Sequence, residues 1–238
     1  MSFYHNPRIV TDGLLVMVDA VNPKSYTSGS TVIQNLAGSG DFTGYNGVGL
    51  SGSAATQRIV FDGVNDFTLR ASTPTSLQGD PSFTVFGACY RTGTISAEGC
   101  WGFGTGTTLD GFASYQGGTP NDISIDLWGN TTLTTTKNYP LNEWVLVHWV
   151  KAAGACNTTN TAMWINDIKY TGGDLFVSRG GVSTPTIGSQ GMSLGRIGYA
   201  VNAYYAPVDL GFITFYDRVL NDAEVIQNYI AMRGRYGL

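Results

Sequence analysis

Short hydrophobic runs separated by turn residues recur along most of the chain. Residues 13–20 (GLLVMVDA) form a nearly continuous apolar run that ends before an Asn-Pro pair, and residues 82–91 (SFTVFGACYR) form another. Residues 142–151 (NEWVLVHWVK) are apolar on both faces, as expected of a central strand. Runs of this length between Gly, Pro, Asn and Asp favour buried β-strands.

Further segments show strand patterns of other kinds. In residues 122–128 (DISIDLW) three apolar residues alternate with Ser124, Asp126 and Trp128, which predicts one buried and one polar face. Residues 161–172 predict a hairpin that turns at Asn166 and Asp167. The remaining strand segments are 58–70, which turns at 62–66, 192–198 and 209–220. The loop-like segment from 28 to 57 is long for a compact domain and predicts an ordered surface excursion.

The pattern changes to that of a helix at residue 221. Asn221 and Glu224 match a helix capping box, and Leu220 with Val225 match a hydrophobic staple. Gly234 is placed to end the helix. One stripe of the helix is predicted to face the rest of the molecule and consists of Val225, Ile226, Tyr229 and Ile230.

Together these elements predict an all-β fold, a two-sheet antiparallel jelly-roll sandwich with one C-terminal α-helix. We expect an N-terminal arm at residues 1–12, the sandwich at 13–220, and a helix and tail at 221–238 packed on the same domain. The sequence shows no internal repeat and no linker that would divide the chain.

The composition argues against several classes of function. The 238 residues carry a net charge of −4 and only 13% charged residues, which argues against nucleic acid as a partner. No apolar run is long enough for a membrane span, so no membrane insertion is expected. The first 13 residues lack the apolar core of a signal peptide, which predicts synthesis in the cytoplasm without one. Three cysteines cannot make a full disulfide framework, and Cys89 reads as a buried free thiol.

The sequence offers little for catalysis. Glycan hydrolysis needs two paired carboxylates, but Glu98 and Glu143 each lack an acidic neighbour two residues away, and Glu224 belongs to the predicted helix cap. Neither a phosphate-binding loop nor a nucleophile elbow is present. We therefore predict no catalytic residues and no enzymatic activity.

Metal-binding patterns are equally sparse, and no cofactor is expected. His5 and His148 are far apart, no cysteine or histidine cluster has zinc spacing, and His148 reads as a hydrogen-bonded core residue. Asp62, Asn65 and Asp66 supply oxygens of the kind that calcium prefers, but a turn in which Asp and Asn bond their own backbone is the favoured reading.

Aromatic residues outside the strand cores are the candidate binding residues. Trp128, Tyr204 and Tyr205 could stack on a glycan or on a partner protein, and partial burial against a loop is the alternative. The two chain ends are predicted to dock onto neighbouring subunits through Phe3, Tyr4, Arg235, Tyr236 and Leu238.

The order of several segments resembles a known family. The segments are GLLVMVDAVNPKSY, IVFDGVNDF, FTVFGACYR, EWVLVHWVK, AMWINDIKY, SLGRIG and GFITFYDRVLNDAEVIQNYIAMRGRYG. They resemble the laminin-G/concanavalin A-like jelly rolls, most closely those of tailed bacteriophage virions, notably cyanophages, from about residue 12 to 238. The resemblance implies two sheets with a shallow concave face, and roles in carbohydrate binding, adhesion or virion architecture, usually without catalysis.

The resemblance leads to a functional expectation. We expect a phage virion structural protein exposed on the capsid, where it would be a decoration protein, or on the tail or its fibres. Its partners would be other virion proteins, with the chain present as a homo-oligomer or in many copies, together with host surface glycans. A stand-alone lectin-like carbohydrate-binding module is the alternative.

Overall fold

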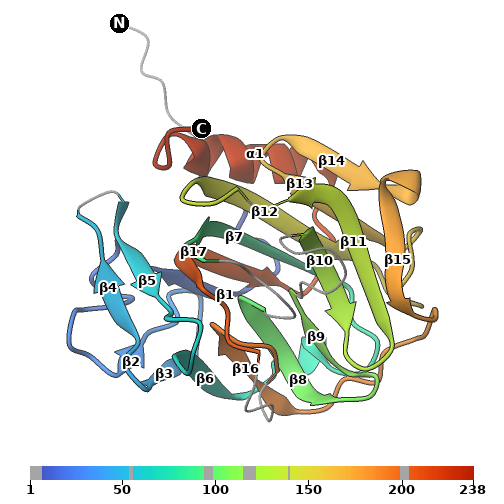
Figure 1. The fold of residues 1–238 in the computed structure, drawn as a ribbon, viewed down its shortest axis with the longest axis horizontal. Helices are drawn as coiled ribbons and strands as arrows, with labels where there is room; N and C mark the ends of the chain where they lie inside the picture. Colours follow the sequence, from blue (N-terminus) through green and yellow to red (C-terminus); the bar gives the residue numbers. More distant parts are fainter. Residues whose placement is uncertain (1–6, 54–55, 94–98, 115–121, 139, 199–203) are drawn as a thin grey trace, which may run out of the picture.

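Two antiparallel β-sheets pack face to face, and one helix lies against the outside of one of them (Figure 1). The computed structural model describes residues 7–53, 56–93, 99–114, 122–138, 140–198 and 204–238. All pairings between its named strands are antiparallel. The predicted all-β jelly-roll-like sandwich with one helix is confirmed.

The first sheet contains eight strands in the order β14-β13-β12-β7-β17-β5-β4, and β1 also pairs with β17. Their bounds are β1 (Leu14–Asp19), β4 (Gly49–Ser51), β5 (Arg58–Val60), β7 (Phe83–Arg91), β12 (Trp144–Lys151), β13 (Thr161–Ile165), β14 (Ile168–Thr171) and β17 (Val208–Tyr216). Every residue of β17 is buried, because one of its faces lies in the sandwich and the other is covered from outside.

The second sheet contains nine strands in the order β15-β11-β10-β9-β8-β16-β6-β3-β2. Their bounds are β2 (Val32–Ile33), β3 (Phe42–Tyr45), β6 (Phe67–Ser72), β8 (Trp101–Thr107), β9 (Asp110–Ala113), β10 (Asp122–Leu127), β11 (Thr131–Asn138), β15 (Leu175–Gly180) and β16 (Gln190–Leu194). Short 3₁₀ turns at Thr75–Leu77 and Gly172–Asp174 lie between strands.

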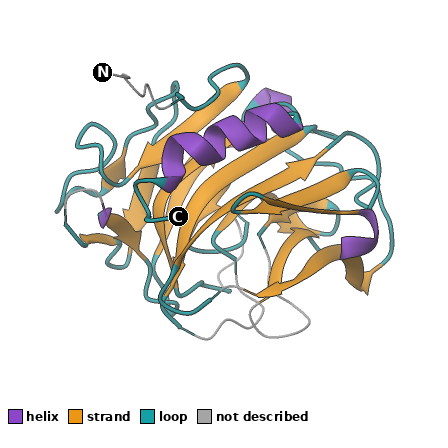
Figure 2. Ribbon diagram, turned by 90° about the horizontal axis from the view of Figure 1, so that it is seen from above, coloured by secondary structure: helices purple, strands orange, loops and turns teal. Residues whose placement is uncertain are grey.

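The molecule has two main hydrophobic clusters. The larger one fills the space between the sheets and includes Trp101, Trp149 and Phe103, all fully buried. The other lies between the eight-stranded sheet and helix α1 (Asp222–Arg233), which runs along the strands in Figure 2, and includes Phe86, Phe212 and Tyr229. Burial on both faces explains why the central strands are apolar at consecutive positions.

Helix α1 begins where the sequence predicts. Asn221 accepts a hydrogen bond from the Glu224 N–H, and the Glu224 carboxylate accepts one from the Asn221 N–H, so the capping box is confirmed. Leu220 and Val225 are both buried in the cluster beneath the helix, as the staple requires. Gly234 follows the last helical residue but keeps right-handed backbone angles, and a tight turn leads the chain on to Tyr236.

The predicted buried stripe of α1 is partly wrong. The residues that are buried are Val225, Asn228, Tyr229 and Met232, whereas Ile230 is 38% exposed and Ile226 is half-buried. A polar residue lies at the centre of this face because its amide binds buried groups. The Asn228 Oδ1 accepts a hydrogen bond from the Val10 N–H at 2.7 Å, and its Nδ2 donates to the Tyr216 hydroxyl at 3.3 Å.

Two further sequence-based expectations are corrected. The segment 28–57 is not a simple surface loop, because it contains β2, β3 and β4, strands too short to show a hydrophobic period. The alternation in 122–128 does not mark an exposed face, because Ser124 and Asp126 are buried along with the apolar residues of β10.

Candidate ligand-binding site

The outer face of the nine-stranded sheet carries a row of small and polar residues. Ser193, Gly102, Ala113, Asp126 and Thr132 face one another in register across five strands. Their neighbours along each strand, such as Phe103 and Leu127, point into the sandwich core. Hydrophobic burial between the sheets therefore leaves this opposite face free to carry polar and aromatic groups.

Five aromatic residues, which we call the aromatic strip, lie on this outer face: Tyr45, Phe67, Trp128, Tyr204 and Tyr205. Tyr45 stacks on Phe67 with ring centroids 4.9 Å apart, and Phe67 lies 5.9 Å from Tyr205. Trp128 meets Tyr204 edge to face at 5.5 Å. Tyr45 and Tyr204 are 42% and 39% exposed, so the strip reaches solvent at both of its ring clusters.

The two ring clusters are joined through the backbone of Tyr204 and Tyr205. Tyr205 forms isolated bridges with Gly99 and Arg196, which fix its position. Tyr204 has a φ of 65°, a left-handed conformation that is uncommon for a bulky residue. Strained backbone of this kind persists where surrounding structure holds it, and it concentrates at binding sites. In this conformation the ring of Tyr204 meets Trp128 and remains partly exposed to solvent.

The segment from Arg196 to Gly198 packs directly on the sheet beneath the strip. Arg196 is 2% exposed, and its guanidinium carbon lies 3.8 Å from the centre of the Phe67 ring. A Cβ on Gly102 would come within 2.4 Å of the Gly198 nitrogen, so only glycine in β8 allows this close approach. The aromatic strip is therefore supported by tightly packed backbone and not by solvent-exposed side chains.

Trp128 is held by the end of β10. The Trp128 N–H donates to the Gly111 carbonyl, and the Trp128 carbonyl accepts from the Leu109 N–H. These two hydrogen bonds fix the backbone from which the indole projects. The ring is half-buried and packs on Ala113 and Ile197. Two residues earlier, the Asp126 carboxylate accepts a 2.5 Å hydrogen bond from the Thr132 hydroxyl. Burial raises the pKa of Asp126 to about 6, against the lowering effect of that bond.

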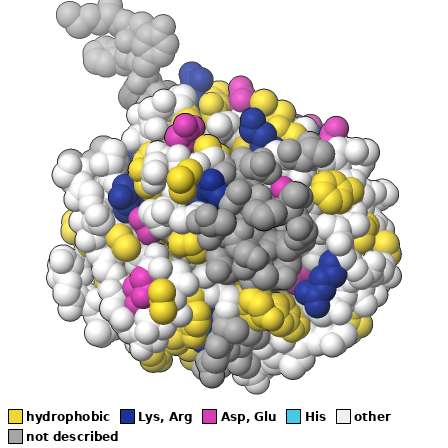
Figure 3. Space-filling view, in the orientation of Figure 1, with side chains coloured by type: hydrophobic (Ala, Val, Ile, Leu, Met, Phe, Trp, Pro, Cys, Tyr) yellow, Lys and Arg dark blue, Asp and Glu magenta, His cyan; other side chains and the backbone are white. Residues whose placement is uncertain are grey.

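The structure thus brings together all three aromatic residues that the sequence singled out, Trp128, Tyr204 and Tyr205. Sequence reasoning missed Tyr45 and Phe67, which occupy facing positions on β3 and β6. The signal was present but faint, because each is the outward aromatic of a short strand. On the face seen in Figure 3, charged side chains are few and scattered, in keeping with a chain that is 13% charged.

Two of the three predicted docking residues at the C-terminus, Arg235 and Tyr236, are bound within the chain itself. Arg235 makes a 2.9 Å ion pair with Asp19 at the end of β1. Tyr236 is 7% exposed and packs on Trp144, over Gly211, whose missing Cβ leaves room for the ring. Leu238 is 37% exposed. Phe3 and Tyr4 lie outside the described residues.

The Asp62–Asp66 segment forms the predicted turn. The Asp62 Oδ1 accepts hydrogen bonds from the backbone N–H groups of Val64, Asn65 and Asp66 at 2.8 to 3.0 Å. Burial alone would raise the pKa of Asp62, but these backbone donors together hold it below its ordinary value. Among the described residues no three His, Cys, Asp or Glu side chains are grouped to hold a metal ion. The calcium alternative stays a prediction.

His148 is a core residue, but the expectation that it is hydrogen-bonded is wrong. It lies fully buried on β12 beneath α1, with its ring stacked 3.8 Å above Phe86. Neither ring nitrogen has a hydrogen-bond partner in the described structure. Burial lowers the pKa of His148 to about 3, so the neutral ring behaves as an aromatic spacer.

Comparisons with known proteins place the fold. No family model matches this chain, and no curated protein sequence matches it. A binding domain of botulinum neurotoxin serotype C1 superposes with a TM-score of 0.61 at 9% identity, covering 92% of this chain and 52% of that one. A binding domain of botulinum neurotoxin DC, in complex with rat synaptotagmin II, gives a TM-score of 0.61 at 10% identity, with 94% and 52% covered.

A second group of similar structures consists of enzymes. The Trypanosoma rangeli sialidase in complex with sialic acid superposes with a TM-score of 0.56 at 12% identity. The match covers 94% of this chain and 33% of the sialidase chain. The likeness is one of fold. The chain spans about half the length of the toxin domains and a third of the sialidases.

In the described part of the chain, no helix combines the length and hydrophobicity that crossing a lipid bilayer requires.

Proposed function

We propose that this protein is a non-enzymatic carbohydrate-binding module whose ligand stacks on the aromatic strip. The observation that carries the proposal is the placement of Tyr204, an exposed tyrosine held in a left-handed conformation so that its ring meets Trp128. A bulky residue held in a left-handed conformation by its surroundings is a feature of preorganised binding surfaces.

Carbohydrate suits the strip better than a charged ligand. The rings of Tyr45, Tyr204 and Trp128 offer flat apolar faces, and the tyrosine hydroxyls add hydrogen-bond donors and acceptors at their edges. The nearby Asp126 is 1% exposed and accepts a hydrogen bond from Thr132, so its carboxylate is not accessible to a ligand. Supporting this class, the similar sialidase was solved with sialic acid bound, although the match covers only a third of that protein.

The absence of turnover is part of the proposal. Glu224, one of the three glutamates, is held by Arg218 in the helix cap at 2.6 Å, behind the opposite sheet. Glu143 lies exposed just before β12, also in the eight-stranded sheet. Neither glutamate belongs to the strands that carry the strip, and the aspartates of β10, Asp122 and Asp126, are buried, whereas a hydrolase would need two facing carboxylates at the ligand.

A broad glycan array with the purified chain tests the proposal, followed by calorimetry with any glycan that binds. Trp128→Ala and Tyr204→Ala should each weaken binding about tenfold or more, by loss of a stacking ring. Tyr204→Phe should keep most of the affinity because the ring remains. Phe176→Ala is the matched control, since Phe176 is equally exposed at 42% but lies on β15 at the far edge of the sheet.

Two outcomes would overturn the carbohydrate assignment. One is the absence of binding to any glycan on the array. The other is capture of a protein ligand that Trp128→Ala abolishes, because aromatic residues are also enriched at protein interfaces. The toxin domain solved with synaptotagmin II shows that a related fold can be found with a protein partner.

We further propose that the module is carried on the surface of a tailed-phage particle, on the capsid or tail, in many copies beside other virion proteins and facing host glycans. This setting rests on the sequence resemblance alone. Purified particles probed with an antibody against the chain give the test. Absence of the protein from the particles would contradict the setting while leaving carbohydrate binding by the free module intact.

A further inference from the structure

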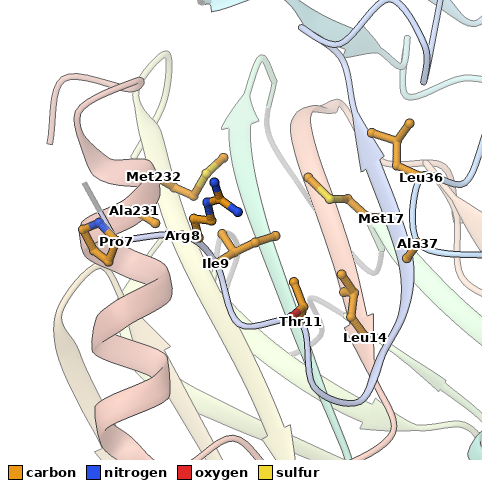
Figure 4. Close-up of a pocket in the computed structure, with 10 residues that line it drawn as sticks. All are labelled: Pro7, Arg8, Ile9, Thr11, Leu14, Met17, Leu36, Ala37, Ala231 and Met232. Atoms are coloured by element: carbon orange, nitrogen blue, oxygen red, sulfur yellow. The ribbon is translucent and has the colours of Figure 1, made fainter. Parts of the chain in front are cut away.

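A second concave site lies away from the strip, beside helix α1. It is a cavity of about 540 Å³ between the helix, the segment before β1, β1 itself and the loop that follows β2. Figure 4 shows the residues that line it, and we call it the trough. Eight of its ten lining residues are apolar, among them Ile9, Leu14, Met17, Leu36 and Met232. A cavity of this volume and lining is the size of a small-molecule site.

The walls of the trough are fixed by hydrogen bonds. Gln227 of α1 donates to the Arg8 carbonyl at 2.7 Å, and the buried Asn228 binds the Val10 N–H. On the opposite wall, the Leu36 N–H donates to the Met17 carbonyl at 2.8 Å. The trough is thus preformed, while the side chains of Met17 and Met232 can adapt to an apolar guest.

Arg8 supplies a positive charge at the trough. Its side chain is exposed, and Figure 4 shows its guanidinium between Met232 and Ile9, turned toward the space between α1 and β1. Arg8 takes part in none of the ion pairs found among the described residues. The lining contains no Asp or Glu within the described chain. An apolar trough with one uncompensated cation is complementary to an aliphatic chain that ends in an anion.

We propose that the trough binds a single-chain aliphatic carboxylate, with the hydrocarbon along Ile9, Met17 and Met232 and the carboxylate on the Arg8 guanidinium. Burial of the chain provides most of the affinity, because each methylene removed from water is favourable. The guanidinium selects for the anionic head group through charge-assisted hydrogen bonds. The site is independent of the aromatic strip, which lies on the other sheet.

Dodecanoate, titrated calorimetrically below the concentration at which it forms micelles, is the probe. One dodecanoate should bind per chain, and Arg8→Ala should weaken its binding about tenfold. Dodecanol, which has no charge, should bind the wild type and Arg8→Ala alike. Ala37→Trp and Ala231→Trp, which fill the trough from opposite walls, should each abolish binding of both ligands at an unchanged melting temperature. Arg179→Ala, an exposed cation on β15, is the matched control.

Three results would overturn the proposal. The first is no saturable binding of dodecanoate to the wild type. The second is equal binding of dodecanoate to wild type and Arg8→Ala, which would leave an apolar site with no preference for an anion. The third is binding that appears only after removal of residues 1–6, which would assign the trough to the chain's own N-terminal segment. Trp128→Ala should keep dodecanoate binding, so failure here is distinguishable from failure of the glycan proposal.

Discussion

Asp62 fixes the turn between β5 and β6 with a single oxygen. Three consecutive backbone N–H groups donate to its Oδ1, an arrangement equivalent to a helix cap. Asp62→Ala should lower the free energy of unfolding by about 1 to 2 kcal/mol. Asp62→Asn keeps an acceptor oxygen in place and should cost less than about 0.5 kcal/mol. Urea unfolding of the three proteins at neutral pH measures both.

The same variants discriminate between the turn and the calcium alternative. If the turn alone explains Asp62, adding calcium should leave the melting temperature of the wild type unchanged. A rise in melting temperature that Asp62→Asn removes would instead favour a cation bound by Asp62 and Asp66, since calcium prefers charged carboxylate oxygens.

His148 predicts a particular pH dependence. Its pKa is near 6.5 in the unfolded chain and about 3 in the folded one, so between these values the unfolded chain binds more protons. The folded state therefore loses stability as the pH falls through this window, by about 3 kcal/mol between pH 7 and pH 4 from this residue alone. His148→Phe, which keeps a ring on Phe86, should remove that part of the loss.

Two buried carboxylates act in the opposite direction. Burial raises the pKa of both Asp126 and Asp209 to about 6, so acidification to pH 4 favours their protonated, folded forms. The net pH profile is consequently flatter than His148 alone predicts. Unfolding measured at pH 7, 5 and 4 should show a steeper acid loss in Asp126→Asn and a shallower one in His148→Phe. Identical profiles for wild type and His148→Phe would contradict the assignment.

At the scale of elements, helix α1 depends on one buried amide. Asn228 binds the Val10 N–H and the Tyr216 hydroxyl, and that hydroxyl donates to the Val10 carbonyl at 3.0 Å. Asn228→Ala leaves a buried N–H without a partner and should lower the free energy of unfolding by about 2 kcal/mol. Gln227→Ala removes only an exposed bond to Arg8 and should cost less than about 1 kcal/mol. Denaturation monitored by tryptophan fluorescence compares them, and equal losses would refute the role of Asn228.

The sequence predicted the central strands of the eight-stranded sheet and the helix, but it missed several strands of the nine-stranded sheet. β7, β12 and β17 are apolar on both faces, and this burial is visible in the pattern itself. β8 reads WGFGTGT and β11 reads TTLTTTKN, where glycines and threonines hide the alternation. These strands are held by pairing with neighbours distant in the sequence, a constraint that a local pattern does not contain.

The same limit applies to predicting the candidate site from the sequence. Trp128, Tyr204 and Tyr205 were recognisable because each breaks a polar or loop-like context. The pattern could not show that Trp128 meets Tyr204, because this contact depends on how the segment after β16 crosses the sheet. The trough escaped prediction for a similar reason, since its walls come from both ends of the chain.

At the scale of the whole molecule, the three cysteines report on global unfolding. Cys89, Cys100 and Cys156 are all buried thiols, and burial raises the pKa of Cys156 to about 12. Ellman's reagent should leave the native protein unlabelled and should modify all three thiols once denaturant unfolds it. A reducing agent should not change the melting temperature. Rapid labelling of a native thiol would show that one side of the sandwich opens without global unfolding.

The position of β17 has a consequence for biosynthesis. This strand pairs with β1, β5 and β7, yet it follows every other named strand in the sequence. The eight-stranded sheet therefore cannot close before β17 has left the ribosome, and until then β1 and β7 lack the strand that joins them. During that interval the unpaired edges of β1 and β7 are open to pairing with other chains.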